Sequence, residues 1–419
     1  MTYLDRDRAA RLMAAAGLDA LLLFTPEGFA YATGASPGVG TMWRRAGAVA
    51  ALVPADPDLP IGAVVSDLFA ESFRAASAVA DIRIHPLWVE TADIRPHDAS
   101  QPVPDLIAAA WAGAGRAAGF ARPETFDAAL GFRLAGDLLA ARKLGSARVG
   151  VELDSLSVSD FAAVSAALPG CRLVDGSDVL RRLKMVKSAL EIAHLRTAVT
   201  LAEVGIGALA AAIAPGQTRD GLAQVWTSAV QAAAREQDIR NLTGQWEYVS
   251  VGANPWSRGG VVEPGSLIKV DVGCLIGGYT SDTGRTFVCG SPTPLQSHLF
   301  DALSQAYEAG LSLIRPGIEM RAVHEAATAA MAKAGFPGFS RGHFGHGLGA
   351  GLGSEEWPFF SATSSVVLEP GMVVAFETPW YVDGVGGMII ENQLLITPDG
   401  HQVMNSLPSG LVSVWPVPA

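Results

Sequence analysis

The sequence contains very little cysteine. Only three cysteines occur among its 419 residues, none of them in a Cys-x-x-Cys pair: Cys171, Cys274 and Cys289. So small and scattered a set excludes a disulfide framework and a zinc-finger site. A chain that does without disulfides suits a reducing compartment, so we expect a cytoplasmic location.

Long apolar runs are also missing. A membrane-spanning helix needs about 18 or more consecutive apolar residues, and no such run occurs. The most apolar helical segment, around residues 204–214, follows Glu203 and ends at Pro215. The N-terminal segment carries Asp5 and Asp7 among its arginines, whereas a secretory signal begins with basic residues alone. Neither a membrane nor a secretory route is therefore expected.

Positive charge is in short supply. Thirty Lys and Arg residues stand against 41 Asp and Glu residues, which leaves a net charge of −11. A surface of that sign repels phosphate backbones, so we do not expect nucleic acid as a partner. Apolar residues make up 49% of the chain and charged ones 17%, which is typical of a globular protein with a large core.

Helix and strand patterns alternate in the first part of the chain. A helical spacing covers residues 6–16 and ends at Gly17, and residues 19–24 (DALLLF) are apolar enough for a buried strand. The alternation predicts an α/β domain over residues 1–175, followed by a second domain over residues 176–419. Its other expected elements are a short helix over residues 29–33 and strands over residues 46–53, 62–65, 82–85 and 148–153.

Paired strands distinguish the second part. Two apolar hairpins are expected, residues 267–274 with 279–288 and residues 373–381 with 388–396. Hairpins with helices packed on one face predict an α+β domain. The expected helices cover residues 179–213, 218–236, 294–314 and 320–334.

Two carboxylates interrupt the first hairpin. With a turn at Ile276 and Gly277, Asp271 and Asp282 face each other on neighbouring strands, where opposed Cβ atoms lie about 5 Å apart. Like charges so placed repel, and an unpaired charge in apolar surroundings is costly. A positive group between the two carboxylates is therefore expected.

The second hairpin repeats this arrangement. With a turn centred on Gly384, Glu377 faces Glu391. Two divalent cations between the pairs would neutralise the four carboxylates, and the stretch RGHFGHGLG supplies His343 and His346 as nitrogen ligands. This oxygen-rich set favours manganese, with zinc, cobalt and iron as alternatives. A two-metal site lowers the pKa of a water and polarises a carbonyl, so the pattern predicts a hydrolase.

Four segments carry a family resemblance: DVGCLIGGYTSDTGRTF, GHGLG, FETPWY and IIENQLLITPDG. They resemble the metal-binding motifs of the pita-bread metallopeptidases, which include prolidase, aminopeptidase P, methionine aminopeptidase and the metal-free creatinase. The resemblance covers residues 182–400 and extends to a creatinase-type N-terminal domain. It implies a pita-bread catalytic domain, a homodimer and hydrolysis of the bond before proline by a metal-bound hydroxide, as in an Xaa-Pro dipeptidase or aminopeptidase.

The resemblance also implies roles for individual residues. Asp282 and Glu391 would bridge two ions, and Glu377 would in addition take the proton of the attacking water. The complete set of implied metal ligands is Asp271, Asp282, His346, Glu377 and Glu391.

The substrate-facing residues depart from the family pattern. Glu355 stands where peptidase members carry a histidine, although counting without a gap puts Gly353 there instead. Trp256, Ser257 and Arg258 stand where another histidine is usual. Ile389 replaces an arginine two residues before the last glutamate. His343 and Glu355 are therefore our candidates for the missing proton-handling groups. Trp256, Arg258 and Trp380 are candidates for substrate contacts, although the two tryptophans would serve equally well in packing.

Three functions are consistent with these features. The first is a prolidase-type hydrolase acting on a small peptide or amide. The second is a non-peptidase relative that hydrolyses a small C–N metabolite, as creatinase does, and the altered substrate wall favours it. The third is a non-catalytic binding module with the same fold, which would have no use for four buried acids around metal ions.

Overall fold

The computed structural model of the chain describes residues 3–257, 259–350 and 355–415. Two compact units make up the chain, Met1–Leu183 and Lys184–Ala419. The division falls within helix α8 (Ser177–Met185), whose residues Val179, Leu180 and Leu183 belong to the core of the first unit. The first unit therefore continues beyond residue 175, where the sequence analysis ended the first domain.

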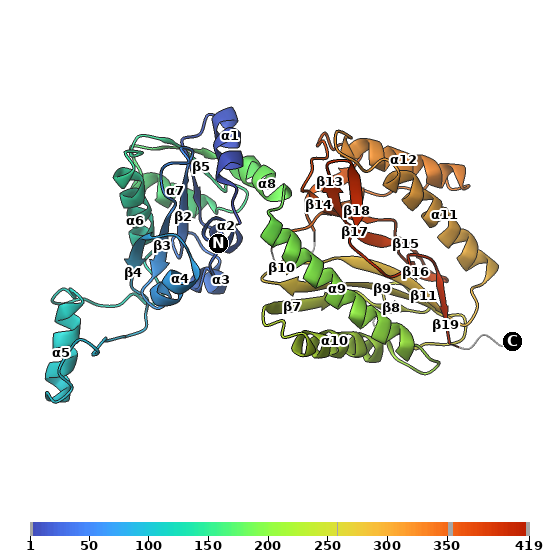
Figure 1. Ribbon diagram of the computed structural model, residues 1–419, viewed down its shortest axis with the longest axis horizontal. Coiled ribbons are helices and arrows are strands. Elements are labelled where there is room, and N and C mark those ends of the chain that lie inside the picture. The colour runs from blue at the N-terminus through green and yellow to red at the C-terminus, as the bar shows by residue number, and fades with distance from the viewer. Residues whose placement is uncertain (1–2, 258, 351–354, 416–419) are drawn as a thin grey trace. The chain divides into compact units, whose positions relative to one another are not determined.

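A sheet of six strands forms the centre of the first unit, counted over the residues described there, in the order β4-β3-β2-β1-β5-β6. Strand β1 runs parallel to β5 and antiparallel to β2. Leu21 and Leu23 of β1 pack on one face with α1, α2 and α4, and Ala20 and Leu22 pack on the other with α6 and α7. Helices on both faces of the sheet confirm the α/β class predicted for this unit (Figure 1).

The remaining elements of the first unit have these bounds: α1 Arg6–Ala16, β1 Ala20–Leu23, α2 Pro26–Thr33, α3 Val39–Trp43, β2 Ala50–Pro54, β3 Gly62–Ser66, α4 Ala70–Ala76, β4 Asp81–His85, α5 Val103–Gly113, α6 Ala128–Ala141, β5 Arg148–Val151, α7 Val158–Ala167 and β6 Arg172–Asp175.

The second unit is built on one large antiparallel sheet with two pairs of helices. Its main path, over the residues described, runs β10-β9-β11-β17-β14-β12-β13, with β7 and β8 on β9, β18 on β17 and β19 on β11. Helices α9 and α10 share a core with β9 and β11, which we call the first half of the unit. Helices α11 and α12 share a second core with β12, β13, β14 and β17, which we call the second half. The arrangement is the predicted α+β layer (Figure 1).

The bounds of the elements in the second unit are as follows: α9 Ala189–Ala212, α10 Arg219–Glu236, β7 Leu242–Glu247, β8 Ser250–Val251, β9 Leu267–Ile276, β10 Tyr279–Thr280, β11 Thr283–Cys289, α11 Pro294–Leu311, α12 Met320–Lys333, β12 His343–Gly347, β13 Glu356–Ser361, β14 Val373–Glu377, β15 Trp380–Val382, β16 Gly386–Met388, β17 Glu391–Thr397, β18 Gly400–Val403 and β19 Val412–Val414.

The long helix predicted over residues 179–213 is wrong in one respect, because it is two helices. Helix α8 ends at Met185, and α9 begins after Ser188. The Ser188 side chain accepts a hydrogen bond from the Glu191 backbone N–H, and the Glu191 carboxylate accepts one from the Ser188 N–H. This reciprocal capping box starts a new helix, and between the helices the Lys187 N–H bonds to Gly371 O.

Helix α9 alone among the described helices is long and apolar enough to span a membrane by length and composition. Half of its most apolar window is buried within the protein. Leu201, Ile206 and Leu209 of α9 belong to the core that this helix shares with α10 and β9. Core helices of this kind pass the same length and composition test.

The register predicted for the first hairpin is also wrong, because the turn lies one residue further along the chain than predicted. The turn lies at Gly277 and Gly278, whose φ angles of 58° and 84° are left-handed and favour glycine. Asp271 therefore pairs with Gly284 and not with Asp282. Because the pairing shifts by two positions, the alternation of side chains between the two faces is unchanged.

The second hairpin has the predicted register. Glu377 pairs with Glu391 in the ladder between β14 and β17, and Trp380 pairs with Met388 in the ladder between β15 and β16. The turn lies around Gly384, whose φ angle is 88°. The expectation that Glu377 faces Glu391 is confirmed.

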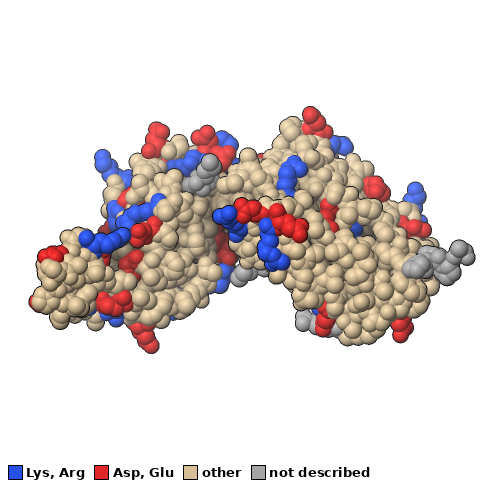
Figure 2. Space-filling view, turned by 60° about the horizontal axis from the view of Figure 1, so that its bottom comes forward, with Lys and Arg blue, Asp and Glu red and all other residues tan. Residues whose placement is uncertain are grey.

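Charged side chains on the surface are mixed in sign. On the face shown in Figure 2, acidic and basic side chains are scattered among uncharged ones on both units. The net charge of −11 is therefore not gathered into one acidic patch on that face.

Candidate metal centre and active site

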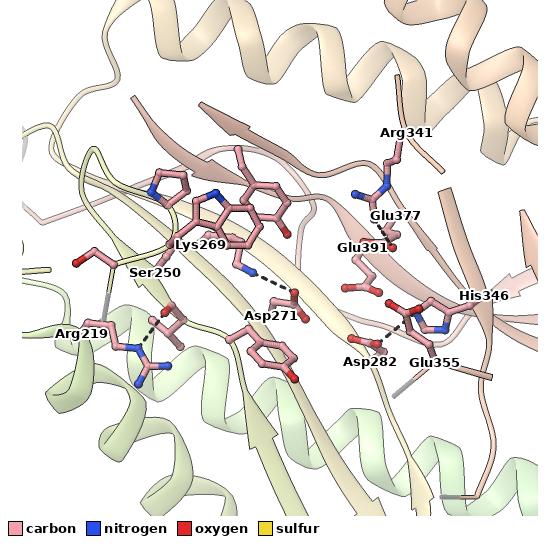
Figure 3. Close-up of a pocket in the computed structure, with 16 residues that line it drawn as sticks. Arg219, Ser250, Lys269, Asp271, Asp282, Arg341, His346, Glu355, Glu377 and Glu391 are labelled. Carbon is pink, nitrogen blue, oxygen red and sulfur yellow. Dashed lines mark hydrogen bonds and ion pairs between the residues drawn. The ribbon is translucent and has the colours of Figure 1, made fainter. Parts of the chain in front are cut away.

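A cavity of about 440 Å³ opens in the second unit. All five predicted metal ligands line it, together with the positive side chains of Lys269 and Arg341 (Figure 3). Its other lining residues are Arg219, Tyr248, Val249, Ser250, Pro255, Trp256, Ser257, Glu355 and Tyr381.

Three of the predicted ligands converge at one point of this cavity. One ligand atom from each of Asp282, His346 and Glu391 lies within 4.8 Å of the others. All three side chains are buried. Asp282 comes from the segment between β10 and β11, His346 from β12 and Glu391 from β17 (Figure 3). Residues far apart in the sequence are therefore brought together by the central strands of the sheet.

The His346 ring is oriented as a ligand. Its Nδ1 lies 3.0 Å from the carbonyl oxygen of Gly347, and because a carbonyl can only accept, Nδ1 carries the hydrogen. The Nε2 lone pair is left free, and Nε2 lies 3.5 Å from Asp282 Oδ2. A backbone acceptor that fixes the tautomer in this way is usual for metal-binding histidines. Gly345 allows β12 to lie close to β14, since a Cβ there would be 2.1 Å from Ala375 O.

The carboxylates of Asp282 and Glu391 lack the partners that a buried charge requires. Among the described side chains, Asp282 Oδ1 and Glu391 Oε2 are buried without any hydrogen bond. Burial, and then the negative charge of neighbouring carboxylates, raises the pKa of both groups well above the ordinary range. A divalent cation between these oxygens and His346 would remove both penalties, so the three residues fit a metal ion.

The other two predicted ligands each contact a positive side chain. Lys269 Nζ lies 3.1 Å from Asp271 Oδ2, and Arg341 Nη2 donates to Glu377 Oε1 at 2.7 Å (Figure 3). Neither cation was among the residues predicted for the site. Lys269 precedes Asp271 by two positions on β9 and therefore shares its face, so alternation was a usable signal. Arg341 lies in a loop before β12 and gives no such signal.

One of the two proposed proton-handling residues lies beside Glu377, and the other lies on the far side of the first. His343 Nδ1 is 3.8 Å from Glu377 Oε1, and its Nε2 is 3.7 Å from Glu355 Oε2. The Gly345 N–H donates to His343 Nδ1, which places the ring hydrogen on Nε2, facing Glu355. Burial lowers the pKa of His343, which favours the neutral ring. The His343 ring therefore lies between Glu377 and Glu355, and Glu355 lines the cavity.

The predicted substrate contacts have different outcomes. Trp256 lines the cavity, and its ring lies against Tyr381 with centroids 4.4 Å apart. Trp380 packs edge-on against Phe336 and Phe339 and lines a neighbouring hollow that also includes Trp256. Arg258 lies outside the described residues.

A buried arginine supports the strand that carries Glu391. Arg285 of β11 is 1% exposed and donates to the backbone oxygen of Glu391 at 2.6 Å and to Asn392 Oδ1 at 2.8 Å. It also forms an ion pair of 3.5 Å with Glu203. Through these contacts Arg285 fixes the end of β17 next to β11.

Removal of this guanidinium is expected to destabilise the protein strongly. Arg285→Met would leave Glu203 and two buried acceptors with fewer partners, so the free energy of unfolding should fall by about 3–5 kcal/mol. Urea denaturation followed by circular dichroism measures the change. Arg240→Ala is the control, because the Arg240 side chain is 86% exposed and its removal should change stability by no more than about 0.5 kcal/mol. Equal stability of the two variants would contradict a supporting role for Arg285.

Comparison with known proteins places this geometry in a family. A family model described as "Metallopeptidase family M24" matches residues 193–398, and one described as "Creatinase/Prolidase N-terminal domain" matches residues 6–186. The Mycobacterium tuberculosis protein named "Probable dipeptidase PepE" is 31% identical over 280 residues, covering 66% of this chain and 73% of that protein. The chain belongs to metallopeptidase family M24.

Two further relatives resemble the chain more distantly. The Xaa-Pro dipeptidase of Pyrococcus horikoshii is 28% identical over 237 residues, which are 56% of this chain and 66% of that protein. The solved Xaa-Pro dipeptidase from Bacillus anthracis matches with a TM-score of 0.73 at 21% identity, covering 98% of this chain and 99% of that one. This structural likeness confirms the predicted fold, a creatinase-type domain followed by a pita-bread domain.

Proposed function

We propose that this protein is a metal-dependent hydrolase of the prolidase type, which cleaves the bond before proline in a dipeptide or at the N-terminus of a short peptide. Membership of metallopeptidase family M24 supports a peptidase, and relatives named Xaa-Pro dipeptidases support the choice of proline. The observation that carries the proposal is the convergence of Asp282, His346 and Glu391 with two buried oxygens that have no partner.

The metal would be held by the five predicted ligands, with Asp282, His346 and Glu391 closest together. A divalent ion bound there supplies a Lewis acid that activates water and polarises the scissile carbonyl. Manganese is the ion we propose, because carboxylate oxygens dominate the ligand set. Buried acids of this kind would serve no purpose in a module that only binds a partner.

Proton transfer is assigned to side chains beside the ligands. Glu377 takes the proton from the attacking water, and Arg341 holds the Glu377 carboxylate in place through its 2.7 Å hydrogen bond. His343 and Glu355, whose nearest atoms are 3.7 Å apart, handle the proton that the leaving nitrogen requires. In this proposal, His343 and Glu355 perform the proton transfers for which peptidase relatives use other histidines.

Substrate contacts are assigned to the aromatic wall. The rings of Trp256 and Tyr381 lie against each other and line the cavity with an apolar face, which suits the pyrrolidine ring of proline. Trp380 supports this wall from the neighbouring hollow and Arg258 is proposed to contact the substrate, as the sequence analysis suggested. We further propose a cytoplasmic homodimer whose partner is a small peptide or amide, and no membrane or nucleic acid.

The altered substrate wall favours a second candidate function. Residue 389 is a buried isoleucine, where prolidases and aminopeptidase P carry an arginine, and the cations Arg219 and Lys269 line the cavity instead. A small polar C–N metabolite would suit such a wall better than a peptide. Hydrolysis of an amide-like metabolite is therefore the alternative.

Activity on a substrate panel separates the two candidates. With manganese present, we expect cleavage of the dipeptides Gly-Pro, Ala-Pro or Leu-Pro, or of longer Xaa-Pro peptides. Chromatography measures the release of the residue before proline. The matched control is Gly-Leu, which lacks the proline ring and should be cleaved far more slowly. If creatine-like or acylated amino-acid substrates are hydrolysed and none of the Xaa-Pro compounds is cleaved, the second candidate function replaces the first.

A further inference from the structure

The centre contains two positive side chains that a count of carboxylates alone leaves out. We propose that the ammonium group of Lys269 takes the place of a second cation at Asp271. The site would then hold one divalent ion firmly at Asp282, His346 and Glu391, and a second only by displacing Lys269. This inference rests on the proposed metal-dependent function.

The balance of charge is the first argument. The sequence predicts two divalent ions because the four carboxylates carry four negative charges. Lys269 and Arg341 contact two of these carboxylates directly, at 3.1 and 2.7 Å. The two remaining negative charges are neutralised by a single divalent ion. Glu355 also lines the cavity, but its side chain is 50% exposed, so water solvates its charge.

The distribution of unsatisfied oxygens is the second argument. Among the described side chains, the buried ligand oxygens without a hydrogen bond are Asp282 Oδ1 and Glu391 Oε2. Both belong to the group that converges with His346. Asp271 and Glu377 instead have their hydrogen bonds to Lys269 and Arg341. The unmet demand for a cation is therefore concentrated at one position.

The confinement of Lys269 is the third argument. Its side chain is 6% exposed, and a buried ammonium needs a charged or polar partner. The ring of Tyr381 lies 5.4 Å from Lys269 Nζ. The backbone of Gly387 also lies near the stem, since a Cβ there would be 3.5 Å from Lys269 Cδ. An ion that binds Asp271 must therefore push the ammonium out of an enclosed position.

Titration of the full-length, chelator-stripped protein with Mn²⁺ tests the proposal. Isothermal titration calorimetry and elemental analysis should show one tightly bound ion per chain and a second bound at least about tenfold more weakly. Lys269→Met keeps the length of the side chain and removes its charge. We expect the second ion to bind about tenfold or more tightly in this variant, since a unit charge at contact distance is removed.

Two further variants make the result specific. Lys269→Gln removes the same charge with a polar side chain and should behave as Lys269→Met does. Arg219→Gln removes a cation from the same cavity whose partners are Glu247 and Asp220, so its effect on the second ion should be several-fold smaller. Thermal unfolding shows whether each variant is folded, and two equally tight ions in the wild-type protein would overturn the proposal even where a variant is not.

Two results would overturn the proposal: two equally tight ions in the wild-type protein, or folded Lys269 variants whose second ion binds no more tightly. Neither result depends on catalysis. A protein with one tight and one weak ion that cleaves no Xaa-Pro substrate would support this inference and contradict the proposed function. Two equally tight ions in a protein that cleaves Xaa-Pro substrates would contradict this inference and support the proposed function.

Discussion

Replacement of Asp282 by asparagine is expected to abolish tight binding of the divalent ion and to lower kcat/KM by about 10³-fold or more. Asp282 is one of three residues whose ligand atoms lie within 4.8 Å of one another, and its Oδ1 has no other partner. The amide keeps the size of the side chain and removes the negative charge that attracts the ion. Calorimetric titration with Mn²⁺ and an assay on Ala-Pro measure the two effects.

The metal-free form provides a second measurement on the same variant. Burial and neighbouring carboxylates make an ionised Asp282 unfavourable, so Asp282→Asn should unfold at a temperature no lower than that of the metal-free wild type. Added Mn²⁺ should then raise the unfolding temperature of the wild type only. Asp383→Asn, in the exposed turn between β15 and β16, is the matched control and should retain both binding and activity. An Asp282→Asn protein with wild-type affinity for the ion would show that the centre lies elsewhere.

The second large effect is expected from Glu377→Gln. If Glu377 takes the proton of the attacking water, its loss should reduce kcat by about 10²–10⁴-fold, the usual contribution of a general base. The amide oxygen can still accept the hydrogen bond of Arg341, so the wall of the cavity should keep its shape. KM for Ala-Pro should therefore change much less than kcat.

Metal content separates a base from a ligand of the first ion. Asp282, His346 and Glu391 remain in Glu377→Gln, so one ion per chain should still be bound and be detected by elemental analysis. Glu263→Gln, at an exposed position outside the cavity, serves as the matched control and should have wild-type kcat. A Glu377→Gln protein with undiminished turnover would refute the assignment of this base.

The two hairpins show how far strand alternation can be used for prediction. Around Gly384 the position of the turn was evident, and the predicted pairing of Glu377 with Glu391 is confirmed. Around Gly277 and Gly278 two successive glycines allowed two positions for the turn, and the pairing of Asp271 was predicted two positions away from its true partner. The predicted ligands still line one cavity, because a shift of two leaves every side chain on its own face.

Other features depend on tertiary contacts or on signals that were overlooked. The Ser188 and Glu191 capping box was present in the sequence and explains the break between α8 and α9. The contact of Arg341 with Glu377 joins a loop to a strand, and no local pattern predicts which loop side chain will reach which carboxylate. Strand alternation therefore predicts which carboxylates line the cavity better than it predicts the cations that contact two of them.

The predicted ligands come from both halves of the second unit, which meet at the seam between β11 and β17. At this seam Gly284 pairs with Glu391, and a Cβ on Gly284 would lie 2.9 Å from the Glu391 Cβ. An ion held by Asp282 from one half and by His346 and Glu391 from the other would cross-link the two halves at this junction. Binding of the metal would then stabilise the folded state, and the free energy of unfolding would rise by about 2.7 kcal/mol at a metal concentration one hundred times the Kd.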